Sequence, residues 1–212
     1  MLEVSNLACT RGDRTLFRGV SFKLEARGLL HVAGANGSGK TSLLRILCGL
    51  GTADGGEVRW RGETLRELRE SYWREVVYIG HANALQDDLS ATENLQLACA
   101  LACRPAANAA ASEALAAFGL AACSQLPVRA LSQGQKRRSA LARLALSMHA
   151  PLWLLDEPFA ALDVAAVSHL EGLILAHIDG GGSVVFTTHQ DATIRARVTQ
   201  CVDLSDVAQA AC

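Results

Sequence analysis

The sequence lacks the features of a membrane-inserted or secreted protein. Half of its 212 residues are apolar, but Arg143 and Pro151 interrupt the run of residues 140–155. Arg104 and Pro105 close the apolar run before it. A helix that spans a bilayer needs about 20 largely uncharged residues, and the N-terminal residues lack the basic opening and apolar segment of a signal peptide. We therefore expect a protein that is made and kept in the cytoplasm.

Concentrated positive charge and paired cysteines are also missing. The net charge is −1, and the strongest basic cluster is the short segment 136–138. Because nucleic-acid binding needs clustered Lys and Arg, nucleic acid is not expected as a partner. The seven cysteines form no CxxC pair and no CxxCH haem-attachment signature. We expect them to be buried free thiols.

Short apolar segments alternate with helical segments, which is the pattern of an α/β domain. One compact chain with two lobes is expected over residues 1–212. The predicted strands are residues 20–24, 29–33, 76–79, 152–155, 184–188 and 201–204, with residues 2–4 and 57–60 in an antiparallel β edge. Helices are predicted at residues 40–48, 163–178 and 191–197.

The middle of the chain has a different pattern, without a convincing strand and rich in Ala and Leu. Ser90 and Glu93 have the spacing of a capping box that opens a helix. Further helices are predicted at residues 108–118 and 132–148. We therefore predict a helical subdomain inserted into an α/β core. The predicted bounds are residues 1–89 and 150–212 for the core and about 90–149 for the subdomain.

A glycine-rich loop joins a predicted strand to a predicted helix. Its sequence, GANGSGKT at residues 34–41, fits the GxxxxGK[ST] phosphate-loop pattern in the required strand–loop–helix context. The glycines allow backbone amides to turn toward phosphate oxygens, and the helix adds its positive N-terminal end. Lys40 is expected to reach the β- and γ-phosphates, and the Thr41 hydroxyl to bind Mg²⁺. The predicted nucleotide-binding residues in this segment are Gly34, Ala35, Asn36, Gly37, Ser38, Gly39, Lys40, Thr41 and Ser42.

Two further predicted strands end in polar residues. The segment LWLLDE is four apolar residues followed by Asp156 and Glu157. A buried parallel strand delivers such groups to its C-terminal edge, where ligands bind in open α/β sheets. Asp156 is expected to hold Mg²⁺ through water, and Glu157 to polarise the attacking water as a general base. His189 ends a neighbouring strand and is expected to contact the γ-phosphate and keep Glu157 and the water in register.

A second possible phosphate cradle precedes another predicted helix. In LSQGQ at residues 131–135, the Ser–Gly pair gives a helix N-terminus with open amides and a hydroxyl. Because the chain already has one cradle, this second one is expected to serve a nucleotide held by another molecule. LSQGQ resembles the LSGGQ signature of ABC ATPases. The order and spacing of the other motifs, including the ALD segment at residues 161–163, resemble this family over essentially the whole chain.

The resemblance implies a P-loop NTPase core with a mainly parallel sheet, an antiparallel β edge and an inserted helical subdomain of the ABC ATPase type. It also implies an ATPase that uses Mg²⁺ with ATP and works as a head-to-tail pair of identical copies. Asp163 would then tie the two ATP sites together across the dimer. The signature residues implied to act in trans are Ser132, Gln133, Gly134 and Gln135.

Two positions depart from the family pattern. Arg11 stands where the family usually has an aromatic residue against adenine, and it is either a guanidinium that stacks on the base or a solvated surface residue. His81 stands where the family usually has the glutamine that contacts Mg²⁺ and water. It either hydrogen-bonds the water in a catalytic role and titrates near neutral pH, or belongs to a structural loop.

A closer resemblance rests on the short chain, RGDRTLF at residues 11–17, Gly80-His81 in place of Pro-Gln, DEPFAALD at 156–163 and TTHQ at 187–190. This set is similar to the ATPase subunits of bacterial cytochrome c maturation systems, which are associated with haem export. It implies the membrane partners CcmB, CcmC and CcmD, a functional link to the haem chaperone CcmE, and a peripheral location on the cytoplasmic side of the inner membrane.

Other interpretations remain open at this point. The chain could drive another ABC transporter with a different cargo. A soluble ABC protein that acts on ribosomes or DNA is disfavoured, because such proteins resemble tandem duplicates or carry long coiled-coil insertions. Membrane contact is expected at a groove near residues 81–94, where Leu85, Leu89 and Leu95 either line the groove or belong to the core.

Overall fold

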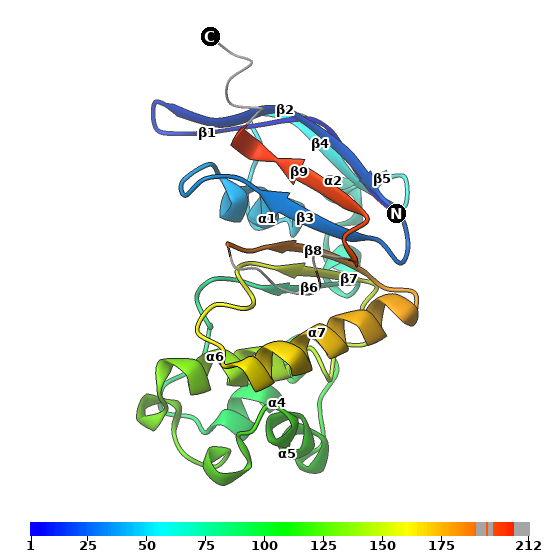
Figure 1. Ribbon diagram of the computed structural model, residues 1–212. Coiled ribbons are helices and arrows are strands. Elements are labelled where there is room, and N and C mark those ends of the chain that lie inside the picture. Colours follow the sequence, from blue (N-terminus) through cyan, green and yellow to red (C-terminus); the bar gives the residue numbers. More distant parts are fainter. Residues whose placement is uncertain (190–193, 195–196, 206–212) are drawn as a thin grey trace.

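A five-stranded parallel sheet forms the centre of the computed structural model, which describes residues 1–189, 194 and 197–205 (Figure 1). The strand order is β6-β7-β8-β3-β9. Strands β7 and β8 are buried along their whole length, as expected for a parallel sheet that is covered on both faces. The bounds are β3 Leu29–Ala33, β6 Val76–Ile79, β7 Leu152–Leu155, β8 Ser183–Thr187 and β9 Gln200–Asp203. These strands confirm the predicted ones to within one residue.

The antiparallel strands form a four-stranded sheet of their own, in the order β2-β1-β4-β5. Its strands are β1 Leu2–Arg11, β2 Arg14–Leu24, β4 Gly55–Trp60 and β5 Glu63–Thr64. The predicted segments 2–4 and 20–24 were too short, because the β1–β2 hairpin continues through three register shifts. Such bulges interrupt the alternation of apolar and polar residues on which a strand prediction depends.

Two apolar cores lie on opposite faces of the parallel sheet. One joins the antiparallel sheet to α1 (Lys40–Leu47) and to one face of the parallel sheet, and it includes Leu43 and Leu154. The other includes Trp153 and Phe186 and packs the opposite face against helices. Helix α7 (Val164–Asp179) runs along this second face, and helices α4 (Ala91–Leu101), α5 (Asn108–Ala117) and α6 (Gln133–Ala142) lie beyond it (Figure 1).

The segment between β6 and β7 contains helices and no strand. Its α-helices are α4 Ala91–Leu101, α5 Asn108–Ala117 and α6 Gln133–Ala142. The predicted capping box is confirmed, since the Ser90 side chain accepts from Glu93 N and the Glu93 side chain accepts from Ser90 N. The prediction that the last helix reaches residue 148 was wrong. After Ala142 the chain continues in turns with i→i+3 hydrogen bonds, a tighter geometry that ends α-helices.

Two short helices, α2 (Leu65–Leu68) and α3 (Glu70–Trp73), were not predicted from the sequence. The helix predicted at residues 191–197 falls largely outside the described residues. In the described part of the chain, no helix combines the length and the apolar character needed to cross a membrane.

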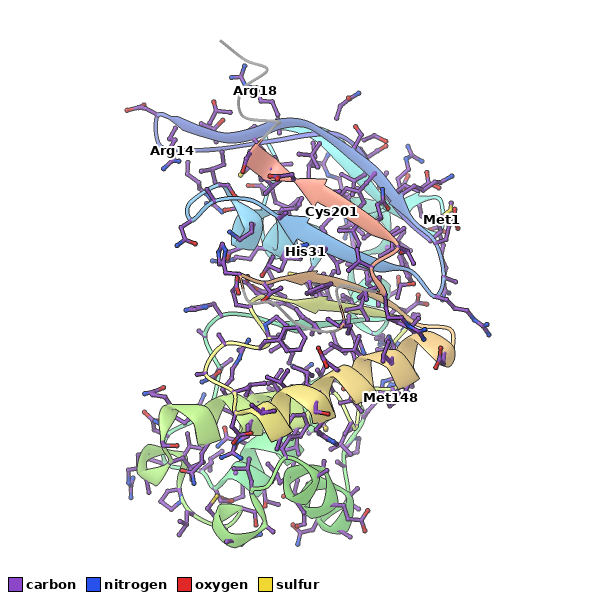
Figure 2. All side chains as sticks on the ribbon, in the orientation of Figure 1. Met1, Arg14, Arg18, His31, Met148 and Cys201 are labelled. Carbon is purple, nitrogen blue, oxygen red and sulfur yellow. The ribbon has the colours of Figure 1, made fainter. Side chains whose placement is uncertain are left out.

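The six described cysteines form no disulfide with one another, but they are not all buried. Cys9, Cys48 and Cys99 are buried, and Cys123 is half-buried. The expectation of burial was wrong for Cys103 and Cys201, which are exposed. Cys103 follows the end of α4, and Cys201 lies on β9, paired with His31 of β3 (Figure 2).

A neutral histidine is built into the core beneath the sheet. His177 of α7 stacks on Trp153 with ring centroids 3.8 Å apart and planes within 3°. A Cβ on Gly182 would lie 2.1 Å from His177 Nε2, so the backbone closes directly over the ring. Burial lowers the pKa of His177 to about 4, because the protonated imidazolium loses its hydration.

This arrangement predicts a pH-dependent stability. The pKa of His177 is lower in the folded chain than the unperturbed value, so the unfolded chain binds the extra proton between about pH 6.5 and 4. Stability therefore falls as the pH drops through that window. Urea unfolding should show that the free energy of unfolding falls between pH 7.5 and pH 5. This fall should be about 2 kcal/mol larger in the wild-type chain than in a His177→Phe variant. Equal changes in the two proteins would contradict this role of His177.

Candidate nucleotide-binding and catalytic site

The glycine-rich loop connects β3 to α1 and depends on backbone conformations that favour glycine. Gly34 has φ +140 and Gly39 has φ +102. A Cβ on Gly39 would also lie 3.0 Å from side-chain atoms of Leu16 and Phe17. Lys40 is 8% exposed, and its Nζ donates to the carbonyls of Gly34 (2.8 Å) and Ala35 (3.0 Å). The loop thus curls around the ammonium group of its own lysine.

Asp156 follows β7 and is nearly inaccessible, with 1% of its surface exposed. Its Oδ1 accepts a hydrogen bond from Thr187 Oγ1 at 2.9 Å. Its Oδ2 is buried and has no hydrogen-bond partner among the described residues. Burial, and then the nearby Asp156, raise the pKa of the Tyr78 phenol to about 12. A buried carboxylate oxygen without a donor is what a bound cation or its water would satisfy.

Glu157 is held in an unusual conformation beside Asp156. Its φ of +48 lies in the left-handed region that non-glycine residues seldom occupy. Its backbone N donates to Thr187 Oγ1 at 2.8 Å. Its Oε2 accepts from the backbone N of His189 at 3.3 Å, and His189 Nε2 lies 3.5 Å from Oε1. The ends of β7 and β8 therefore lock the carboxylate and the imidazole next to each other.

One cavity of about 480 Å³ brings most of the predicted site residues together. It is lined by Leu16, Asn36, Gly37, Gly39, Lys40, Thr41, Ser42, His81, Asp156, Glu157 and His189. Gly34, Ala35 and Ser38 do not line it. Arg11 lines an adjoining cavity, which shares Thr41 and Ser42 with the first. Leu16 was not anticipated from the sequence.

The signature residues Ser132, Gln133, Gly134 and Gln135 do not line this cavity. Ser132 begins α6 with a capping box, in which its Oγ accepts from Gln135 N and its N donates to Gln135 Oε1. Ser132 and Gln133 are exposed. Asp163 caps α7 by accepting from Ala166 N at 2.8 Å, and its other oxygen lies 3.6 Å from Arg138 Nη1. Its carboxylate is therefore engaged within its own chain.

Comparison with known proteins identifies the family of the chain. Residues 17–160, more than half of the chain, match the family described as ABC transporter. The chain belongs to the ABC transporter family. The phosphate loop, the end of β7 and the signature of this ABC ATPase all lie within the matched residues.

Individual relatives match the chain over at least 90% of its length. A protein of Aromatoleum aromaticum named cytochrome c biogenesis ATP-binding export protein CcmA is 50% identical over 208 residues, covering 98% of this chain and 97% of the relative. A protein of Salmonella typhi with the same name is 50% identical over 190 residues, covering 90% of each. The dimeric post-hydrolysis state of the ATP-binding cassette MJ0796, with ADP and Pi bound, is 25% identical. It superposes with a TM-score of 0.84 and covers 97% of this chain and 95% of that one.

The contacts of Arg137 in this ABC ATPase were not predicted from the sequence. Its side chain is buried at 4% exposure. Nη1 donates to Gly80 O (2.8 Å) and Asn83 Oδ1 (3.3 Å). Nη2 donates to Asp156 O (2.9 Å) and Glu157 O (2.8 Å). Lys136, Arg137 and Arg138 lie near the N-terminus of α6, where the helix dipole disfavours positive charge. This unfavourable placement was the sequence signal that one of the three side chains binds elsewhere in the fold.

We expect Arg137→Met to impair turnover, because the backbone that carries Glu157 loses two donors. Small misplacements of a catalytic group cost up to about 100-fold, so kcat should fall between about tenfold and 100-fold with a smaller change in KM for ATP. Arg129→Met, at an exposed arginine paired with Asp88, is the matched control. Steady-state ATPase assays, with thermal unfolding to verify folding, measure the effect. A folded Arg137→Met variant with normal kcat would contradict it.

Proposed function

We propose that this ATPase is the motor subunit of an ABC complex in cytochrome c biogenesis, where it couples ATP hydrolysis to haem export or to release of a haem-loaded chaperone. The observation that carries the proposal is the 50% identity to a CcmA over nearly the whole of both chains. The cavity that gathers the phosphate loop, Asp156, Glu157 and His189 supports hydrolysis as the driving reaction.

In this proposal the glycine-rich loop binds the nucleotide phosphates. The amides of residues 34–39 surround the phosphates, the Lys40 ammonium leaves the loop carbonyls to contact the β- and γ-phosphates, and Ser42 lies in the first turn of α1. Arg11 stacks on the adenine, which its place in a cavity next to Thr41 supports.

Thr41 and Asp156 would hold Mg²⁺, the first through its hydroxyl and the second through water. Their shared cavity and the unpaired buried Oδ2 of Asp156 fit a hard cation with oxygen ligands. When bound, Mg²⁺ neutralises charge on the phosphate oxygens. The Thr187 hydroxyl keeps the Asp156 carboxylate aimed into the cavity.

Glu157 acts as the general base that orients and deprotonates the attacking water. His189 keeps the carboxylate in place and contacts the γ-phosphate, while His81, which lines the same cavity, contacts the water. The side-chain exposures of 18% for Glu157 and 48% for His189 leave both accessible from the cavity.

The second wall of the ATP site comes from another copy of the chain. Ser132, Gln133, Gly134 and Gln135 act in trans on the γ-phosphate, and Asp163 communicates between the two sites. In support, Ser132 is exposed and outside its own chain's cavity. Residues from about 90 to 149 form the helical subdomain that carries this signature. Residues 1–89 and 150–212 form the core.

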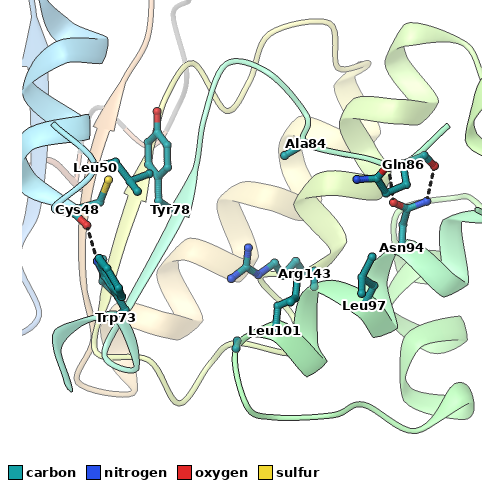
Figure 3. Close-up of a pocket in the computed structure, with 13 residues that line it drawn as sticks. Cys48, Leu50, Trp73, Tyr78, Ala84, Gln86, Asn94, Leu97, Leu101 and Arg143 are labelled. Carbon is teal, nitrogen blue, oxygen red and sulfur yellow. Dashed lines mark hydrogen bonds between the residues drawn. The ribbon is translucent and has the colours of Figure 1, made fainter. Parts of the chain in front are cut away.

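The complex is completed by integral membrane subunits. We infer CcmB, CcmC and CcmD as partners and CcmE as the chaperone served, with the ATPase on the cytoplasmic side of the inner membrane. A cavity of about 470 Å³ between the core and α4 supports a docking site (Figure 3). It is lined by Cys48, Leu50, Trp73, Val76, Tyr78, Ala84, Gln86, Asn94, Leu97, Ala98, Leu101, Ala102 and Arg143.

The leucines predicted from the sequence to line this groove, Leu85, Leu89 and Leu95, do not line it. Leu95 is 3% exposed and belongs to the core, and Leu85 packs against the same core. Leu89 is half-buried and does not line the cavity. Seven large apolar side chains are exposed in the described part of the chain, and four of them line the groove. These four are Leu50, Trp73, Leu97 and Leu101.

Glu157→Gln should trap an ATP-bound dimer, because binding is retained while the base is lost. Turnover should fall by about 100-fold or more. Size-exclusion chromatography with ATP and Mg²⁺ should then show a dimer. The control is Asp179→Asn, at an exposed carboxylate at the C-terminal end of α7, and this variant should not accumulate the dimer. Normal turnover in Glu157→Gln would remove this residue from the mechanism.

The biogenesis role predicts complementation. In a bacterium that lacks its own CcmA, expression of this chain should restore haem-stained c-type cytochromes, and Glu157→Gln should not. If the wild-type chain is produced, hydrolyses ATP and still restores none, the cargo belongs to a different ABC system.

A further inference from the structure

A thiol and an imidazole face each other on the two strands at one end of the parallel sheet. Cys201 of β9 pairs in register with His31 of β3 (Figure 2). Cys201 Sγ lies 3.9 Å from His31 Nδ1, a distance at which an S–H group can donate to nitrogen. Cys201 is exposed, whereas His31 is 9% exposed. The thiol can therefore be reached from outside while its imidazole partner is shielded.

The second ring nitrogen determines which atom of His31 can accept a proton. His31 Nε2 lies 3.4 Å from the carbonyl oxygen of Thr188. Because a carbonyl oxygen only accepts, Nε2 carries the hydrogen, and Nδ1 of the neutral ring is the basic nitrogen that faces Cys201. The ring also stacks on Phe186, with centroids 5.0 Å apart. The three groups are thus a nucleophile, a base and a carbonyl that orients the base, an arrangement that activates thiols.

We propose that Cys201 is a site of reversible thiol modification, at which glutathione disulfide or a similar small disulfide forms a mixed disulfide with the chain, and that this modification slows ATP hydrolysis. His31 Nδ1 accepts the proton of the thiol, and the thiolate attacks one sulfur of the small disulfide. The new S–S bond forms as the old one breaks. The departing thiolate takes the proton from His31, so the products are one mixed disulfide and one small thiol. The inference concerns the ATPase itself and is independent of its cargo.

The chemistry of the pair favours covalent exchange over a metal ion as the function of this site. One sulfur and one nitrogen provide two ligands, whereas a protein zinc site has three or four. Among the residues that the structure describes, no group of three or more His, Cys, Asp or Glu side chains is placed to hold a metal ion. A single activated thiol is sufficient for disulfide exchange.

Two short connections link the thiol to the nucleotide cavity. Thr188, whose carbonyl contacts His31, directly precedes His189 in the chain. Just after β9, Ser205 Oγ accepts a hydrogen bond from the backbone N of Ala35 in the phosphate loop at 3.4 Å. A tripeptide attached to the thiol would separate the sulfur from the imidazole and load the strand that carries Ser205. Both connections therefore transmit the modification to groups that surround the nucleotide.

Labelling with iodoacetamide at pH 7.5, followed by peptide mass spectrometry, tests the activation of the thiol. An ordinary thiol is less than about a tenth ionised at this pH, so Cys201 should react about five- to tenfold faster than an unassisted thiol. Cys103, exposed in the turn after α4, is the internal reference. The decisive variant is His31→Gln, whose amide can donate to the Thr188 carbonyl but cannot take the thiol proton. It should lower the rate at Cys201 to that of Cys103 and leave ATP hydrolysis unchanged. Equal rates in the wild-type chain, or no change in folded His31→Gln, would overturn the inference.

Incubation with glutathione disulfide tests the effect on hydrolysis. Mass spectrometry should locate one glutathione on Cys201, and kcat should fall about fivefold or more, since small misplacements of catalytic groups cost up to about 100-fold. A reducing agent should restore kcat. Cys201→Ser should keep its activity under this treatment, whereas the control Cys103→Ser should lose it as the wild-type chain does. A mixed disulfide on Cys201 with unchanged kcat, or an equal loss in Cys201→Ser, contradicts the inference and leaves the proposed function untouched.

Discussion

The site depends on the side-by-side pairing of β3, β8 and β7 in one parallel register. Because Val32 pairs with Thr187 and Leu155 with Phe186, the three strands end at one edge of the sheet. The Thr187 hydroxyl then reaches both the Asp156 carboxylate and the Glu157 amide. A shift of one residue would turn these groups to opposite faces. Burial on both faces, by two separate apolar cores, is what fixes the register.

The loop after β6 connects two cavities with different proposed tasks. His81 lines the cavity of the phosphate loop, while Ala84 and Gln86 line the groove next to α4. Arg137 of α6 ties this loop to the backbone of Glu157 through Gly80 and Asn83. A partner in the groove therefore acts on a loop that is hydrogen-bonded, through one guanidinium, to the proposed base. The loop and the hydrogen bonds of Arg137 thus connect the two cavities.

The sequence predicted the parts of the fold that local pattern determines. Buried strands have short, mostly apolar sequences, so β3, β6 and β7 were located. The loop glycines and the carboxylates after β7 identified the cavity. Features set by distant contacts were missed. The length of the β1–β2 hairpin depends on bulges. The end of α6 depends on a change of hydrogen-bond pattern. The hydrogen bonds of Arg137 involve residues up to 57 positions away in the sequence. Which leucines lie in the groove likewise depends on how α4 packs, which no local pattern encodes.

The central claim is that ATP is bound between Lys40 of one copy and Ser132 of the other. Its most direct test mixes two inactive variants, Lys40→Ala and Ser132→Arg, and measures ATP hydrolysis. A hybrid dimer has one site in which both residues are intact, so the account predicts activity in the mixture that neither variant has alone. If differently tagged copies prove that hybrid dimers form and no hydrolysis returns, the two residues do not meet across the dimer and the account is wrong.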